Sequence, residues 1–427
     1  MNEREKAFLA LRRVERTEAR ADFAIEAEVE EERERGFLRT VVLGALRNRT
    51  KLDYLIEKLA KRNVESLDPD VSTLLRTALY ELYEMRSPAY AVVNEAAGIA
   101  ARRFPRAKGF VNGVLRNASR TPIESLLPED DSPRSISVRT GHPEWLLRRW
   151  ITHFGSDRAA KIAEADQEAS WPDLLVNTER ISLDDAELLL DSKGIEHVRS
   201  PFGIPVLRLR TSTVPVAEEI GKGLFHAMDE GSVLVAHLIR EGSSVADLAA
   251  APGGKTIVLG MRRCRVTASD VSLARLMTLR AAAKRFLNQP PHIVAADATR
   301  LPFRTRFDAV LLDAPCSATG TLRKNPEARW RTGEADLTRY AEAQLAMLSA
   351  SASIAGGEIL YSTCSLEPEE NREVVARFLE ANRDFVRGPL LERVPPALRS
   401  AVHESELSLT PEYGTDGFTV TLLTRVK

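Results

Sequence analysis

Two of the three cysteines in this 427-residue chain stand in settings that indicate chemistry. Cys316 lies in the segment DAPCS (residues 313–317), and Cys364 lies in STCS (residues 362–365). Each segment follows a short apolar run that is typical of a buried strand. A lone cysteine is most often a small buried hydrophobic residue, which is our interpretation of Cys264, inside another predicted strand. Two thiols just past strand ends, in a chain nearly free of cysteine, indicate nucleophilic catalysis.

A loop of small residues lies between another predicted strand and a helix. Small residues let a ligand approach the backbone closely, and exposed backbone N–H groups bind anionic groups. The spacing is neither G-x-G-x-x-G nor G-x-x-x-x-G-K-[ST], which disfavours a dinucleotide site and a P-loop. A tight turn that binds no ligand is the alternative interpretation. The residues predicted to bind a cofactor here are Ala249, Ala250, Ala251, Pro252, Gly253, Gly254 and Lys255.

Acidic residues stand at the ends of three successive predicted strands, namely Asp247, Asp270 and Asp297. Asp270 stands where an acid can hydrogen-bond ribose hydroxyls, as in dinucleotide-binding folds. Asp313 follows the fourth strand, beside Cys316. Either Asp270 or Asp297 alone could be a helix cap or a solvated acid. Their recurrence at strand ends favours one shared site.

The elements that must position these residues alternate between strands and helices. Alternation of this kind predicts an open, largely parallel α/β sheet, with functional residues at the carboxyl ends of its strands. We expect helices over 271–286 and 336–354. The predicted strands cover 244–248, 264–269, 292–295, 307–312 and 358–362.

The residues before this sheet form other kinds of structure. The first 120 are rich in helix-forming residues, notably over 5–20 and 32–61, and Asp68-Pro69 is a predicted helix start. Residues 121–139 contain three prolines and are predicted to be a linker. A mixed α+β segment follows. We therefore predict an all-helical domain over 1–125, a small α+β domain over 140–223 and an α/β domain over 224–427.

Bulk composition narrows the functional classes. Hydrophobic residues make up 44% and charged residues 28%, as in ordinary soluble globular proteins. The charged N-terminus and the absence of a long apolar run predict a cytoplasmic protein without a membrane span. Three cysteines and seven unclustered histidines predict neither disulfides nor a metal site. His226 and His237 are expected to be structural.

The net charge of −1 leaves nucleic-acid binding to local patches. Residues 100–120 contain basic residues and no acidic ones, which favours RNA binding over a merely solvated face. The basic turn over 323–330 is either a plain surface turn or a contact to an RNA backbone. The basic residues of the 100–120 patch are Arg102, Arg103, Arg106, Lys108, Arg116 and Arg120.

Taken in order, these motifs resemble the RNA (cytosine-5)-methyltransferase family, which includes the bacterial Sun/Fmu and the eukaryotic Nop2/NSUN proteins. The resemblance rests on 249–255, Asp270, Asp297, 313–317 and 362–365. It implies a Rossmann-like class I methyltransferase domain that binds S-adenosylmethionine. It also implies that Cys364 is the nucleophile and that Cys316 assists product release.

That chemistry explains why two thiols are useful. Carbon 5 of cytosine is a weak nucleophile until a thiolate adds to carbon 6, and the enzyme thiol must later be expelled. Asp313 is the candidate that hydrogen-bonds or protonates the ring at N3. The target base must also leave its stack.

The N-terminal part resembles the antitermination factor NusB, over segments 75–82, 91–96 and 109–116. Within the methyltransferase family a NusB-like domain is typical of the RsmB type, which implies 16S rRNA as the partner, either naked or in an early small-subunit particle. The same chemistry on tRNA or 23S rRNA is one alternative, and a non-catalytic RNA-binding assembly factor is another. Intact Asp313, Cys316 and Cys364 argue against the second.

The chain departs from the family pattern in three places. Ala249 stands where the family usually has cysteine, so the loop loses that side chain. Met228 replaces the glutamine of a Gln-Asp pair, and Leu175 replaces an arginine before Val176. None of these changes removes a predicted catalytic group. The last two concern details of RNA or cofactor contact.

Overall fold

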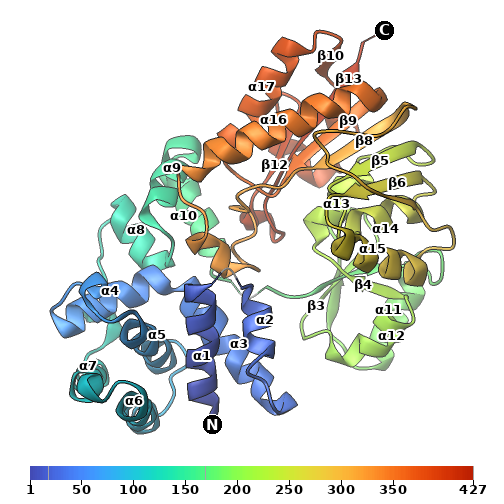
Figure 1. The fold of residues 1–427 in the computed structure, drawn as a ribbon. Helices are drawn as coiled ribbons and strands as arrows, with labels where there is room; N and C mark the ends of the chain where they lie inside the picture. The colour runs from blue at the N-terminus through green and yellow to red at the C-terminus, as the bar shows by residue number, and fades with distance from the viewer. Residues whose placement is uncertain (18, 169, 427) are drawn as a thin grey trace. The chain divides into compact units, whose positions relative to one another are not determined.

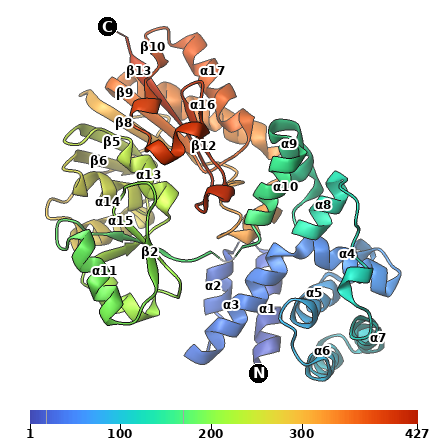
Figure 2. The ribbon, with the colours of Figure 1, turned by 180° about the vertical axis from the view of Figure 1, so that it is seen from behind.

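A computed structural model describes residues 1–17, 19–168 and 170–426 (Figures 1 and 2). Packing divides the chain into two compact units. The first, here the helical unit, comprises residues 1–168 and 322–334; the second, here the sheet unit, comprises 169–321 and 335–427. A segment directly after the loop of Cys316 therefore packs with residues from the N-terminal half of the chain.

The helical unit begins with seven α-helices. Asp68 caps α5 before Pro69, as the sequence predicted, and the side chain of Asn2 caps α1. The helical stretch predicted over 32–61 is two helices. It breaks at Asn48, whose side chain hydrogen-bonds the Gly44 carbonyl in competition with the helical backbone. These helices are α1 (Glu3–Arg16), α2 (Ala21–Glu26), α3 (Glu32–Arg47), α4 (Arg49–Ala60), α5 (Pro69–Tyr83), α6 (Ala89–Arg103) and α7 (Lys108–Ala118).

The stretch expected to be a linker is partly helical. Pro133 occupies the first turn of α8 (Pro133–Thr140) and Ser132 caps it, so this proline starts a helix instead of preventing one. Ile136 and Val138 on α8 are buried. Two further helices and the short helix η5 of the 322–334 segment belong to the same unit: α9 (Glu144–Phe154), α10 (Ser156–Ala165) and η5 (Pro326–Trp330).

The sheet unit starts with a small antiparallel sheet in the order β2-β3-β1-β4. Its apolar residues pack against two helices in a core that includes Leu174, Leu190 and Phe225. The elements are β1 (Asp173–Val176), α11 (Leu183–Ser192), β2 (His197–Arg199), β3 (Val206–Leu209), α12 (Ala217–Gly221) and β4 (Phe225–Ala227).

The large sheet has the order β11-β12-β13-β9-β8-β5-β6-β7, and β10 pairs with β13. The five strands from β9 to β7 are parallel, which confirms the predicted α/β class, whereas β13, β12, β11 and β10 are antiparallel additions. The strands are β5 (Ser244–Leu248), β6 (Arg265–Asp270), β7 (His292–Ala295), β8 (Phe307–Asp313), β9 (Ala355–Thr363), β10 (Phe385–Arg387), β11 (Val402–His403), β12 (Glu406–Leu409) and β13 (Phe418–Arg425).

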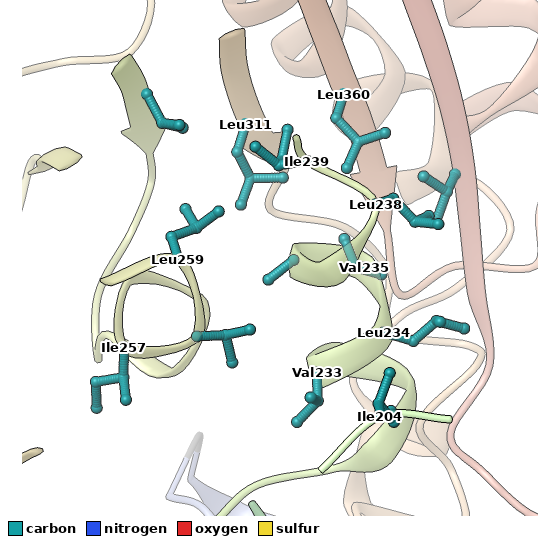
Figure 3. Packing of buried hydrophobic residues seen from close by; sticks show 14 of the residues in the cluster. Ile204, Val233, Leu234, Val235, Leu238, Ile239, Ile257, Leu259, Leu311 and Leu360 are labelled. Atoms are coloured by element: carbon teal, nitrogen blue, oxygen red, sulfur yellow. The ribbon is translucent and has the colours of Figure 1, made fainter. Parts of the chain in front are cut away.

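Helices cover both faces of this sheet because alternate strand residues point to opposite sides. Val245 and Leu311 belong to the core under α13, α14 and α15, whereas Ala246 and Leu312 belong to the core under α16 and α17. Figure 3 shows apolar side chains of α13 and α14 packed beside Leu311. The helices are α13 (Glu230–His237), α14 (Gly254–Met261), α15 (Leu273–Phe286), α16 (Asp336–Ile354) and α17 (Arg372–Ala381).

The strand order also fixes where a ligand can bind. From β5 the chain continues to β6 and β7 on one side of the sheet, and then returns to β8 and β9 on the other side. Such a switch point opens a crevice at the carboxyl ends of the two central strands. The loops after β5, β8 and β9 all start there.

Candidate active site

The loop after β5 is built from residues that admit a tight path. Ala249 has φ +55° and Gly253 has φ +111°, both in the left-handed region. A Cβ on Gly253 would lie 2.7 Å from the Leu279 side chain, so only glycine fits. A Cβ on Gly254 would lie 3.0 Å from the sulfur of Met228.

This loop borders a cavity of about 420 Å³. Seven of the residues predicted to hold a cofactor line it, all except Gly253, Asp270 and Asp297. The other lining residues come from β4, α13, β5 and α15, together with Met228 directly after β4. The predicted residues in the lining are Ala249, Ala250, Ala251, Pro252, Gly254, Lys255 and Asp313.

Asp247, the first of the three strand-end acids, also lines the cavity, although it was not among the residues predicted to bind a cofactor. Its side chain is buried, and its Oδ2 accepts a 2.5 Å hydrogen bond from Thr256 Oγ1. Burial, opposed by that bond, raises its pKa to about 7. Within the described residues, Asp247 Oδ1 has no hydrogen-bond partner. A buried acceptor without a donor, at the wall of a cavity, suits the ammonium group of an amino-acid ligand.

Asp270 and Asp297 occupy different settings. Asp270 is buried, and it accepts hydrogen bonds from the backbone N–H groups of Ala251 (3.2 Å) and Ser272 (2.9 Å), so it braces the cofactor loop. Asp297 is exposed beyond β7 and accepts bonds from the Thr299 backbone and hydroxyl, which lower its pKa. Their proposed contacts to a cofactor stay predictions.

Asp313, at the end of β8, is held from two sides. The ammonium of Lys255 lies 2.7 Å from Asp313 Oδ2 and also 2.8 Å from Ser232 Oγ. Ser362 Oγ, on the neighbouring strand, donates to Asp313 Oδ1 at 2.8 Å. Both carboxylate oxygens are therefore engaged, which fixes the direction in which this acid faces the cavity.

The two cysteines meet because β8 and β9 are parallel neighbours in register. Asp313 pairs with Ser362, so the chain reaches Cys316 and Cys364 a few residues beyond the same edge. The Gly320 N–H donates to the Cys364 carbonyl at 2.9 Å, which ties the two loops together. Their sulfur atoms lie 2.9 Å apart and are both free thiols.

The surroundings of Cys316 oppose the loss of its proton. The hydrogen bond with Cys364, burial, and the charges of Cys364 and Glu370 together raise the pKa of Cys316 well above its usual value. Cys316 therefore keeps its proton at neutral pH. Cys264 lies elsewhere, in the hydrophobic core, with its sulfur 3.5 Å from the Arg240 carbonyl.

Glu370 connects the two cysteine loops, and sequence analysis missed it. Its Oε2 accepts from the Ser317 N–H at 2.9 Å and from Gln344 Nε2 at 2.8 Å. Its Oε1 accepts from the hydroxyls of Ser317 and Ser365. Ser317 and Ser365 directly follow the two cysteines. No spacing rule identifies such a residue, because Glu370 stands in a surface-like run of acids, Glu367 to Glu370, and only the fold buries it.

The basic patch over 100–120 is exposed at all six predicted positions. Two of them, Arg102 and Arg103, form ion pairs with Glu5. The segment 323–330 behaves differently. Arg329 is buried and donates to the backbone carbonyls of Arg47 and Asp166, so its interpretation as a plain surface turn is wrong.

Family models match three parts of the chain. A model of 16S rRNA methyltransferase RsmB/F matches residues 235–424, the NusB family matches 1–120, and an RsmF/B-like ferredoxin-like domain matches 142–217. A Bacillus subtilis protein described as a probable ribosomal RNA small subunit methyltransferase B is 32% identical over 97% of both chains. The chain belongs to this methyltransferase family. A Pseudomonas putida relative, described as ribosomal RNA small subunit methyltransferase B, is 31% identical over 98% of this chain and 97% of its own.

Solved structures extend the likeness to the fold. The crystal structure of PH0851 matches 99% of both chains at 24% identity with a TM-score of 0.81. NSun6 from Pyrococcus horikoshii, solved with SFG, matches 67% of this chain and 98% of its own at 20% identity and a TM-score of 0.59. The family is therefore one of methyltransferases with a NusB-like helical part and a Rossmann-like catalytic sheet. In the part of the chain that the structure describes, no helix is long and apolar enough to cross a bilayer.

Proposed function

We propose that this enzyme transfers a methyl group from S-adenosylmethionine to carbon 5 of a cytosine in 16S rRNA, through a covalent bond between Cys364 and carbon 6 of the base. The observation that carries the proposal is the meeting of two free thiols, 2.9 Å apart, at the strand ends that also present Asp313 to the cavity. A protein that only binds RNA needs none of these groups.

The cavity after β5 suits S-adenosylmethionine. Its loop has no bulky side chain before Lys255, and Asp247 offers an unpaired acceptor for the ammonium group. We assign cofactor binding to 249–255, Asp270, Asp297 and Asp313. When bound, the cofactor supplies an electrophilic methyl group on its sulfonium.

The protein groups then act in sequence on the base. The Cys364 thiolate adds to carbon 6, which forms an S–C bond and makes carbon 5 nucleophilic. Asp313, held in place by Lys255 and Ser362, donates a proton in its acid form to N3 as electron density grows there. After methylation the carbon-5 proton passes to a water molecule, and the C5–H electron pair forms the C5=C6 bond. The S–C6 bond breaks with its electron pair on the Cys364 sulfur, and N3 returns its proton to Asp313.

Cys316 is suited to the last step. Because its pKa is raised, it stays a thiol and can donate a hydrogen bond to the sulfur of Cys364, its neighbour at 2.9 Å. A donor at that sulfur stabilises the departing thiolate. Cys364 as the attacking group is the order of action that the family resemblance implies.

The relatives' printed names and the NusB match favour small-subunit rRNA, free or in an early particle, over tRNA or 23S rRNA. We assign RNA binding to the helical residues 1–125 and to the small α+β part over 140–223, and catalysis to 224–427. The exposed basic residues of 100–120 supply positive charge for phosphate contacts.

One pair of variants tests the chemistry. Cys364→Ala should abolish methylation, whereas Cys316→Ala should accumulate a covalent RNA–protein adduct that survives a denaturing gel. Methylation by Cys364→Ala at the wild-type rate would falsify the assigned roles. Cys264→Ala is the matched control, because it removes the one thiol outside the site and should keep the wild-type rate.

The substrate is tested separately. Bisulfite sequencing of rRNA from a deletion strain should show one or more 5-methylcytosines missing from 16S rRNA and restored by the intact gene. If 16S rRNA is unchanged and a position in tRNA or 23S rRNA is lost instead, the chemistry stands and the assigned substrate is wrong.

A further inference from the structure

Glu370 is a carboxylate buried in the sheet unit, in the short helix η6 (Pro368–Glu370), and the reaction described above gives it no role. Its side-chain oxygens accept four hydrogen bonds, the number that a carboxylate can take. Within the described residues it forms no ion pair; its partners are two hydroxyls, one amide and one backbone N–H. A buried charge costs stability unless its environment is arranged for it.

The partners of Glu370 show what the arrangement is for. Ser317, which follows Cys316, donates both its backbone N–H (2.9 Å) and its hydroxyl. Ser365, which follows Cys364, donates its hydroxyl at 2.5 Å, and the two hydroxyls also contact each other at 3.0 Å. One carboxylate thus grips the residue after each reactive thiol.

Two further contacts anchor the glutamate itself. Gln344 on α16 donates to Glu370 Oε2 and also to the Pro315 carbonyl at 2.9 Å, one residue before Cys316. Tyr361 on β9 donates its hydroxyl to the Glu370 backbone carbonyl at 2.6 Å. Helix α16 and strand β9 therefore hold the carboxylate at a fixed place relative to the sheet. We call Glu370, Ser317, Ser365 and Gln344 the glutamate clamp.

We propose that Glu370 is a positioning residue that holds the Cys316 and Cys364 loops face to face by accepting hydrogen bonds from both at once. The proposal rests on the proposed function, since it matters only if the two thiols act on one base. The rate of a reaction between oriented groups falls steeply when one group is displaced, so a small shift of either loop lowers turnover by about 100-fold. Because the Glu370 side chain is buried and cannot contact RNA directly, its loss should change kcat and leave KM for RNA nearly unchanged.

The test compares Glu370→Ala, Glu370→Gln and Glu373→Gln in the full chain, with rRNA transcript and S-adenosylmethionine. Glu373 is exposed three residues along the chain, so the same chemical change there should keep the wild-type kcat. Glu370→Ala should lose about 100-fold in kcat. Glu370→Gln should recover about tenfold of that loss, because an amide keeps the shape but has one acceptor oxygen. In both variants KM for RNA should stay within about threefold.

A second readout separates positioning from a general folding defect. In the Cys316→Ala background the adduct forms by Cys364 attack alone, so its rate of appearance on denaturing gels reports the Cys364 loop. Adding Glu370→Gln should slow that rate about tenfold per folded molecule, with folded protein measured by circular dichroism. A misfolding defect would lower the folded fraction and leave the rate per folded molecule unchanged, which would overturn the proposal.

Other outcomes are equally decisive. A folded Glu370→Ala with kcat within threefold of wild type would overturn the proposal; if that variant does not fold, Glu370→Gln at the wild-type kcat would do so. Cys364→Ala is measured in parallel. If it still methylates RNA, the proposed function fails whatever Glu370 does, so the two failures are distinguishable.

Discussion

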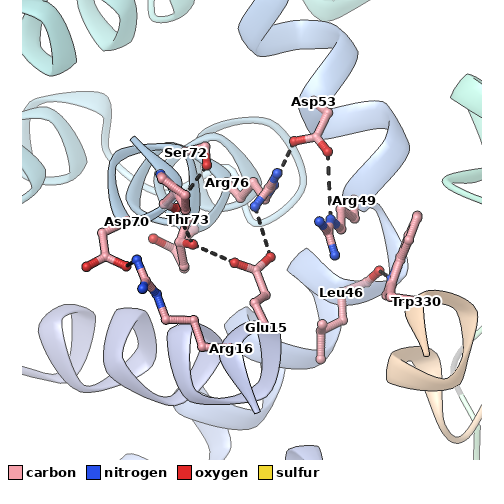
Figure 4. Close-up of polar contacts among 12 residues, drawn as sticks. Glu15, Arg16, Leu46, Arg49, Asp53, Asp70, Ser72, Thr73, Arg76 and Trp330 are labelled. Carbon is pink, nitrogen blue, oxygen red and sulfur yellow. Dashed lines mark hydrogen bonds and ion pairs between the residues drawn. The ribbon is translucent and has the colours of Figure 1, made fainter. Parts of the chain in front are cut away.

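Two clusters of buried polar side chains, one in each unit, stabilise a buried charge in different ways. In the helical unit, Arg76 on α5 bonds Asp53 on α4 at 2.6 Å and Glu15 on α1 at 3.0 Å (Figure 4). Burial alone would lower the pKa of Arg76, but the charges of Asp53 and Glu15 raise it above its usual value. In the glutamate clamp the buried charge of Glu370 is met by neutral donors.

The difference teaches what each cluster is for. The arginine cluster, Arg76 with Glu15 and Asp53, balances charge and joins three helices, so its removal should affect folding. The glutamate clamp keeps an uncompensated carboxylate next to two thiols, at a cost to stability. A local loss of stability is expected where the arrangement of side chains is needed for a reaction. The following predictions test whether the two clusters differ in this way.

The largest effect on stability is expected from Arg76→Met. It removes the cation that Glu15 contacts at 3.0 Å and leaves Asp53 with the longer 3.8 Å pair to Arg49, and breaking a buried ion pair in this way costs about 3 kcal/mol of the free energy of unfolding. Trp145, Trp150 and Trp330 all lie in the helical unit, so denaturation followed by tryptophan fluorescence reports on it.

The control for Arg76 is Arg39→Met. Arg39 pairs with Asp22 at 2.6 Å with both side chains about half exposed, and such pairs contribute less than about 1 kcal/mol. The share of covalent RNA adduct in folded Arg76→Met should match wild type. An altered adduct share at unchanged stability would mean that the arginine cluster serves the reaction, and the distinction would collapse.

The next-largest effect is expected from acid, which should lower the free energy of unfolding of the helical unit. His142 is fully buried beside Asp166, at 3.2 Å, and burial together with the charge of Arg329 lowers its pKa to about 4 from an unfolded value of 6.5. Between these values the unfolded chain binds a proton that the folded chain does not. Stability contributed by neutral His142 is therefore full above pH 6.5 and is lost as the pH falls towards 4.

The expected loss from His142 is about 2 kcal/mol between pH 7 and pH 5. Urea unfolding followed by tryptophan fluorescence at the two pH values measures it, with Asp166 and Arg329 as the charged groups that face the ring. His142→Asn should be less stable at pH 7 and should flatten the dependence. An equally steep dependence in that variant would contradict the assignment to His142.

The smallest effects should separate the two halves of the glutamate clamp. Ser317→Ala removes a donor on the Cys316 side, so release should slow and the adduct share should rise. Ser365→Ala acts on the Cys364 side, so adduct formation should slow instead. Each change should cost about tenfold in turnover, or ~1.4 kcal/mol of activation free energy. Identical adduct shares in the two variants would show that the clamp does not divide in this way.

Much of the fold could be predicted from local pattern. The strands 244–248 and 292–295 and the helix 336–354 have the predicted bounds, because an apolar run bounded by turn residues or a long helical period identifies such elements. The predicted helix bounds were wrong where a single residue starts or ends a helix. Asn48 breaks a helix, and Pro133, expected within a linker, begins one.

The small antiparallel strands at the C-terminus and the packing of 322–334 with the helical unit could not be predicted. Both depend on partners distant in sequence. Arg329 shows the reason: by type and neighbours it belongs on a surface, yet it is buried because three backbone carbonyls from α3, α8 and the end of α10 converge on it. No local window contains those carbonyls.

The same division holds for the site. The sequence alone identified the candidate site residues and their place at strand ends, namely Cys316, Cys364, Asp313 and the loop 249–255. Small residues, thiols and acids at those spacings can be interpreted without knowing which residues surround them in space. That the two sulfurs lie 2.9 Å apart follows only from the folded structure, because it depends on the parallel register of β8 with β9. The burial of Glu370 beside the two loops likewise arises from contacts between residues far apart in the chain.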